Sequence, residues 1–114
     1  MIFMNTLHKG RFRWIIFKDG KDWIGTALEF NITVTGEDPR VVEVELNEAV
    51  QGYLDAARKL KGIRTHQVQA LLNQDAEAEY EERWKAARES MRGNVPSPLA
   101  NDIYRFGVAN LAIA

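Results

Sequence analysis

The order of elements predicted between residues 11 and 61 constrains the fold of this chain more than any other feature. Phe12–Phe17 and Trp23–Phe30 are rich in aromatic and β-branched residues, which favour β-strands. Asp19-Gly20 stands between the two runs, and an Asp-Gly pair in that position is typical of a two-residue hairpin turn. The first half of the chain is therefore predicted to open with a β-hairpin.

A type I′ turn centred on Asp19-Gly20 would also fix the pairing of the two strands. Large residues would then face small ones across the hairpin, as cross-strand packing prefers. The expected pairs are Ile16 with Trp23, Trp14 with Gly25 and Phe12 with Ala27 on one face, and Ile15 with Ile24, Arg13 with Thr26 and Arg11 with Leu28 on the other.

A third strand and a long helix follow the hairpin. Residues 31–35 (NITVT) alternate as a short strand, and Gly36 can end it. Asp38 is a suitable N-cap, and Pro39 suits the first helical position because its missing N–H does no harm there. Apolar residues then recur every three or four positions over residues 39–61, which predicts an amphipathic helix. They are Val42, Leu46, Ala49, Val50, Tyr53, Leu54, Ala57 and Leu60.

The second half of the chain carries weaker signals. A short helix is predicted within residues 63–72 and a longer, charged one over residues 75–92, followed by a linker at 93–98. The apolar end should dock, as an added strand or in a groove of a second chain, and Ile103–Phe106 or Val108–Ile113 could supply a fourth strand. We therefore expect an αβ domain over residues 1–62 and a helical extension with a docked tail over 63–114.

Composition excludes several classes of protein. A chain of 114 residues is long enough for one domain, or for one small domain with an appendage. Its net charge of −1 argues against a protein whose main task is general nucleic-acid binding. Without cysteine the chain has no disulfide, no thiolate nucleophile and no zinc–thiolate site. Its start does not resemble a secretory signal, and no apolar stretch approaches the roughly 20 residues that span a bilayer. We expect a cytoplasmic protein.

No catalytic constellation accompanies these elements. His8 and His66 lie far apart, and neither has a second ligand at metal-binding spacing. The first strand, RFRWIIF, has none of the acidic residues that a two-metal nuclease requires, and no nucleophile elbow, P-loop or dinucleotide fingerprint occurs. Glu29, in a strand, could pair with Arg11 or Arg13. We expect neither an enzyme nor a cofactor nor a metal site.

Lys9, Arg11 and Arg13 alternate, so all three should project from one side of a strand. Such a strip could meet phosphates or an acidic protein. The same pattern also fits a solvated sheet face whose basic residues discourage aggregation at an edge. Both interpretations remain open from the sequence, and Lys9, Arg11 and Arg13 are the candidates for nucleic-acid binding.

The order of hairpin, third strand, Gly, Asp-Pro and helix resembles the HicB family of small prokaryotic domains. The matching segments are WIIFKDG from Trp14, WIGTALEFNITVTGEDP from Trp23 and VVEVELNEAVQGYLDAA from Val41, about 50 of the 114 residues. The resemblance implies an α+β fold, β-β-β-α-β, similar to a truncated ribonuclease-H-like layer without nuclease chemistry. Its three- to four-stranded, mainly antiparallel sheet would carry the long helix, followed here by a C-terminal helix and apolar tail.

The resemblance also implies a function, because the best-known HicB proteins are antitoxins that block a small, basic, RNA-cleaving HicA-type toxin. Many carry a C-terminal DNA-binding motif, which residues 63–114 lack, so DNA binding is not expected. The alternatives are an orphan, self-associating structural domain, forming a homodimer or larger assembly, and a nucleic-acid binder. The expected partner contacts are Arg11, Arg13, Ile15, Phe17 and Ile24 on an exposed sheet face, with Tyr104 and Phe106 of the tail.

Overall fold

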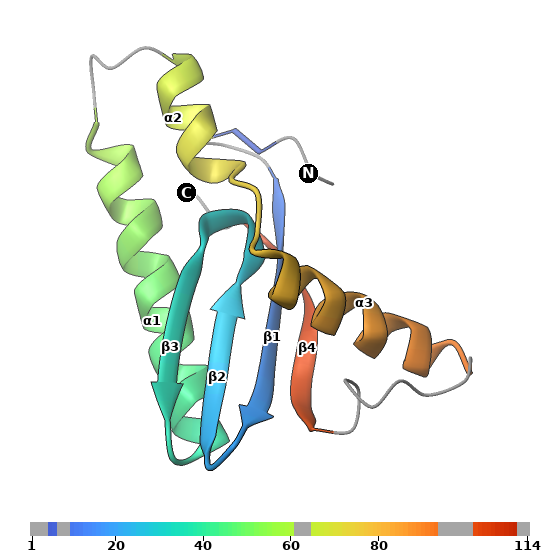
Figure 1. The fold of residues 1–114 in the computed structure, drawn as a ribbon. Helices are drawn as coiled ribbons and strands as arrows, with labels where there is room; N and C mark the ends of the chain where they lie inside the picture. Colours follow the sequence, from blue (N-terminus) through green and yellow to red (C-terminus); the bar gives the residue numbers. More distant parts are fainter. Residues whose placement is uncertain (1–4, 7–9, 61–64, 94–101, 112–114) are drawn as a thin grey trace.

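The computed structural model describes residues 5–6, 10–60, 65–93 and 102–111. It is an α+β fold with one four-stranded antiparallel sheet in the order β3-β2-β1-β4 (Figure 1). The elements are β1 (Arg11–Asp19), β2 (Asp22–Ala27), the 3₁₀ turn η1 (Leu28–Phe30), β3 (Ile32–Gly36), α1 (Pro39–Arg58), α2 (Thr65–Leu72), α3 (Ala78–Met91) and β4 (Ile103–Asn110).

The predicted hairpin is present, but its predicted register is wrong. Asp19 pairs with Asp22, so the turn residues are Gly20 and Lys21, and Ile16 lies opposite Gly25 instead of Trp23. Of the turn residues only Gly20 has a positive φ, 64°, which fits a type II′ turn with glycine first. The pairs that form are displaced by two residues from the expected ones, and because side chains alternate with a period of two, they keep their expected faces. Arg11, Phe12 and Arg13 precede this ladder, because β2 ends at Ala27, opposite Trp14.

β2 is shorter than expected because the chain leaves the strand at Ala27 and makes the turn η1. Asn31 ends this turn in the left-handed region, with φ 52°. The turn interrupts the alternation of a strand, so that Phe30 enters the core beneath α1 while Glu29 reaches Arg13 on the opposite face. An extended strand would have placed Glu29 on the α1 side.

α1 begins as predicted and ends at Arg58, three residues earlier than expected. The Asp38 side chain accepts a hydrogen bond from the backbone N–H of Arg40 at 2.9 Å, which confirms the expected N-cap. Gly25 allows the helix to lie close to β2, because a Cβ at that position would be 2.8 Å from the Val42 Cγ1. The buried residues of α1 are Val42, Leu46, Val50, Leu54 and Ala57.

Two hydrophobic clusters lie on opposite faces of the sheet. The first joins α1 and α2 to Phe12 and Ile16 of β1, and the second joins α3 to Ile15 and Phe17. Figure 1 shows α1 behind the sheet and α3 crossing its front. The sequence left open which face the long helix covers, and the structure assigns it the face of Phe12 and Ile16.

The apolar tail supplies the fourth strand, as expected, and β4 contains the first candidate segment and the first three residues of the second. β4 pairs with β1 in antiparallel orientation, with Trp14 opposite Gly107 and Phe12 opposite Ala109. A single helical crossover from β3 would return the chain parallel to β1. Here α2 and α3 also lie between β3 and β4 in the chain, and β4 runs antiparallel to β1. The predicted segments 1–62 and 63–114 thus contribute strands to one sheet.

Candidate functional site

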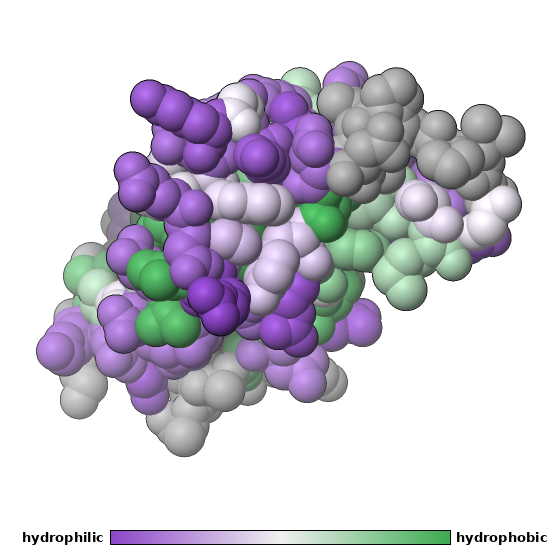
Figure 2. Space-filling view, turned by 90° about the horizontal axis from the view of Figure 1, so that it is seen from below, coloured by the Kyte–Doolittle hydropathy of each residue, from purple (hydrophilic) through white to green (hydrophobic). Residues whose placement is uncertain are grey.

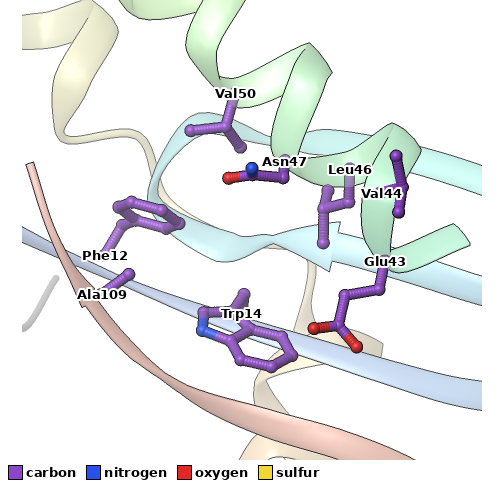
Figure 3. A pocket seen from close by; sticks show the side chains of 8 residues that line it. All are labelled: Phe12, Trp14, Glu43, Val44, Leu46, Asn47, Val50 and Ala109. Carbon is purple, nitrogen blue, oxygen red and sulfur yellow. The ribbon is translucent and has the colours of Figure 1, made fainter. Parts of the chain in front are cut away.

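A groove lies between α1 and the part of the sheet formed by β1 and β4. α1 packs mainly over β2 and β3, so the adjacent surface of β1 and β4 is left partly open. The resulting cavity has a volume of about 390 Å³ (Figure 3). We call it the Trp14 groove. Its lining residues are Phe12, Trp14, Glu43, Val44, Leu46, Asn47, Val50 and Ala109.

The floor of the Trp14 groove consists of aromatic rings beside small residues. Figure 3 shows Phe12, Trp14 and Ala109 on the sheet, facing the α1 side chains. Gly107 lies opposite Trp14 across the strands, and a Cβ added there would be 3.4 Å from the indole ring. Gly107 and Ala109 add little bulk on this face, and Trp14 beside them is half-buried.

α1 forms the wall of the groove and brings charge to it. Glu43 accepts hydrogen bonds from Nη1 of Arg105 on β4, at 3.2 and 3.3 Å, which links the wall to the sheet edge. Both side chains are partly exposed, 34% for Glu43 and 60% for Arg105, so water screens the pair and its contribution to stability is small. A charged group of a ligand can therefore exchange with either partner.

α1 carries glutamates and exposed apolar residues, and one glutamate, Glu43, lines the groove. Glu43, Glu45 and Glu48 follow one another within two turns, and no Lys or Arg occurs between residues 41 and 57. Val44 at the rim is 57% exposed, and Val41, outside the groove, is 49% exposed. Figure 2 views the molecule from the end where α1 begins, and hydrophobic side chains interrupt the polar surface there. This combination suits a basic ligand with an apolar side chain.

The opposite sheet face, expected to be exposed, is covered by α3, and that expectation is wrong. Arg13 is only 2% exposed, and Ile15 and Phe17 are fully buried. Arg13 donates to Glu29 from Nε at 2.9 Å and from Nη2 at 2.6 Å, which is one of the two pairings considered for Glu29. Its guanidinium also donates to Glu81 of α3 at 2.7 and 2.6 Å.

This buried network explains why a basic residue can lie under a helix. Burial alone would lower the pKa of Arg13, but the hydrogen bonds to Glu81 and Glu29 outweigh it and raise the pKa. The hydrogen bonds from Arg13 hold the pKa of Glu81 below its ordinary value, against an opposing effect of burial. The arginine is therefore charged and paired, and it ties β1 both to η1 and to α3.

The remaining predicted site residues do not form one surface. Arg11 is exposed, Ile24 is half-buried against the second cluster, and Phe106 packs edge-on against Trp84 at 6.3 Å. Tyr104 is 36% exposed and packs against Trp23. Lys9 lies outside the described residues. Because Arg13 is internal, the described part of the expected basic strip is not continuous.

Sequence reasoning did not select the residues of the groove wall. Glu43 and Asn47 were indistinguishable from other polar residues on the outer face of the helix. Val44 carried a signal, since it is a large apolar residue on the polar side of an amphipathic helix. Glu81 and Trp84 were also missed as partners of Arg13, because they are about 70 positions away in the chain.

Neither a metal site nor a membrane span is found in the described parts of the chain. These residues contain no group of three or more His, Cys, Asp or Glu side chains that could hold a metal ion. None of the described helices is long and apolar enough to cross a bilayer. Comparison with known protein families, curated proteins and solved structures finds no match to this chain.

Proposed function

We propose that this chain is a non-catalytic, HicB-like protein-binding module that uses the Trp14 groove to hold a basic partner protein. The observation that carries the proposal is the juxtaposition of the half-buried Trp14 with the carboxylate of Glu43 in one cavity, on a helix that has no Lys or Arg between residues 41 and 57. Tryptophan is enriched among the residues that dominate binding energy at protein interfaces. Acidic groups beside it favour association with a positively charged surface.

The chemistry of the groove defines the partner more narrowly. An aliphatic or aromatic side chain of the partner fills the space over Phe12 and Trp14, and an arginine or lysine of the partner replaces Arg105 at Glu43. A small basic toxin of the HicA type has the required charge, and the specific form of the proposal is an antitoxin that binds and blocks such a toxin. The resemblance in residues 14–57 supports this form.

A nucleic-acid-binding function has less support. The expected contacts were Lys9, Arg11 and Arg13, and Arg13 is engaged by two carboxylates beneath α3. The carboxylate of Glu43 in the wall of the Trp14 groove would repel a phosphate there.

The test uses two exposed valines of the same helix. Val44→Arg adds bulk and positive charge at the groove rim, whereas Val41→Arg makes the same change outside the groove. Tagged wild-type and variant proteins are expressed in the native host, and the captured proteins are quantified by mass spectrometry. We expect a small basic protein, in stoichiometric amount, with the wild type and Val41→Arg but not with Val44→Arg. Equal capture by both variants, or no enriched basic protein, would overturn the proposal.

A second step separates the antitoxin from other binding modules. The captured protein is purified alone and incubated with RNA, with and without the wild-type chain. RNA cleavage that the wild type suppresses and Val44→Arg does not is the expected result for an antitoxin. A partner that does not cleave RNA would remove the antitoxin form and leave protein binding in place.

A further inference from the structure

The wall of the Trp14 groove presents two polar side chains one helical turn apart. Glu43 and Asn47 both line the cavity, and residues at this spacing are neighbours on one face of a helix. Figure 3 shows the Glu43 carboxylate and the Asn47 amide between α1 and the sheet. Among the described residues, the Asn47 amide has no hydrogen-bond partner and only Arg105 donates to Glu43. The wall therefore has acceptors for a ligand with several N–H groups.

The opposite face of the sheet shows how this chain accommodates an arginine. The guanidinium of Arg13 lies 5.3 Å from the centroid of the Trp84 ring. The same group donates to the carboxylates of Glu29 and Glu81. A guanidinium suits such a site because its planar face stacks on an indole while its N–H edge donates to a carboxylate. The Trp14 groove also has an indole and a carboxylate in one cavity, and no cation of the described residues stacks on Trp14.

Arg105 reaches Glu43 from the sheet without lining the groove. It lies opposite Ile16, on the face that α1 covers, and is not among the lining residues of the cavity. Its Nη1 atom donates to both oxygens of the Glu43 carboxylate. The charge of Glu43 is therefore paired while no described cation lies on Trp14. An exposed ion pair of this kind is weak, so a second guanidinium can replace Arg105.

We propose that the Trp14 groove holds one arginine side chain of the partner protein, and that Arg105 takes its place at Glu43 when the partner is absent. The partner's guanidinium lies on the part of the Trp14 ring nearest Glu43, donates to that carboxylate and donates to Oδ1 of Asn47. A lysine has no planar group to stack on the indole, so arginine is preferred. This inference rests on the proposed function, because it names the partner residue that the groove binds.

A titration of the full chain with a single amino-acid derivative tests the site. The probe is N-acetyl-arginine methylamide, compared with the lysine and citrulline derivatives at equal ionic strength. The indole N–H signal of Trp14 is followed by NMR and is assigned, among the three tryptophans, by its absence from Trp14→Phe. We expect the arginine derivative to shift this signal, the lysine derivative to shift it less and the uncharged citrulline derivative to leave it in place. No response to the arginine derivative, or an equal response to either of the others, would overturn the proposal.

Two variants test the roles of Glu43 and Arg105. Glu43→Gln should lose the response, because the amide does not carry the charge that pairs with the guanidinium. Arg105→Gln should bind the arginine derivative up to about fivefold more tightly, since it no longer competes for the carboxylate. The control is Arg92→Gln, which removes the same charge at the end of α3 and should bind as the wild type does. Binding to Arg105→Gln that is no tighter than binding to the control would refute the competition.

The two proposals for the groove fail in different ways. If capture of a basic protein depends on residue 44 but the arginine derivative leaves Trp14 unaffected, the arginine site is wrong and the protein-binding function stands. If the derivative shifts Trp14 but no basic protein is captured, the arginine site stands and the protein-binding function is wrong.

Discussion

Replacing Arg13 by methionine is expected to lower the free energy of unfolding by about 3–5 kcal/mol, the usual result of removing one partner of a buried ion pair. The side chains of Arg13 and Glu29 are 2% and 1% exposed, so the carboxylate left behind cannot be solvated. Its remaining hydrogen bond would come from the backbone N–H of residue 13, at 2.6 Å in the wild type. Methionine fills similar volume, which limits the effect to the lost charge pairing.

The assay is urea unfolding followed by tryptophan fluorescence, with three comparisons. Glu81→Gln should have an effect of about 1 kcal/mol or less, because the Glu81 side chain is 40% exposed and water screens its interaction with the arginine. The double variant Arg13→Met with Glu29→Gln should be more stable than Arg13→Met alone, since it no longer buries an unpaired charge. Arg13→Met costing less than about 1 kcal/mol, or no gain in the double variant, would refute the reasoning.

The same network predicts a pH dependence. The pKa of Glu81 is lowered in the folded state by its hydrogen bonds to Arg13, from an ordinary value of 4.5. A carboxyl whose pKa is depressed by folding stabilises the fold above its unfolded pKa, and this contribution is lost as the pH falls through the folded pKa. The difference in stability between the wild type and Glu81→Gln should therefore be full at neutral pH and shrink below about pH 4.5. A difference that grows on acidification would contradict this assignment.

Three further predictions concern α1. Gly25→Ala should destabilise the fold by about 1–3 kcal/mol, because the added Cβ would lie 2.8 Å from a methyl group of α1. Gly52→Ala, where the added Cβ meets open space, should instead stabilise the fold by about 0.5–1 kcal/mol. Thermal melts in which both substitutions change the stability in the same direction would contradict this. Leu46→Asp, at a position 4% exposed, should abolish cooperative unfolding in circular dichroism, and a native melting curve would refute the helix packing. Hydrogen bonds from the side chain and backbone of Arg40 lower the pKa of Asp38. Asp38→Ala should therefore destabilise the protein at neutral pH, and this effect should disappear as acid protonates the Asp38 carboxylate in the wild type. Thermal melts at a series of pH values would check both.

Much of α1 and its cap could be predicted because the signals are local. Asp38 and Pro39 satisfy the first turn of the helix without help from the rest of the molecule. The spacing of Leu46, Val50 and Leu54 defines one apolar stripe whatever surface it packs against. The groove could not be predicted in the same way, because Trp14, Val44 and Ala109 meet only when α1 settles over β2 and β3.

The sequence by itself determined that a hairpin, a third strand and a capped helix would form, and that the apolar tail would dock. Tertiary structure decided the hairpin register, since moving the turn by one residue, from Asp19-Gly20 to Gly20-Lys21, shifts the strand pairing by two residues and leaves the hydrophobic alternation unchanged. It also decided that Arg13 is internal. A basic residue in an alternating strand is predicted to face water unless a carboxylate such as that of Glu81, 68 positions away, is brought to it by a packed helix.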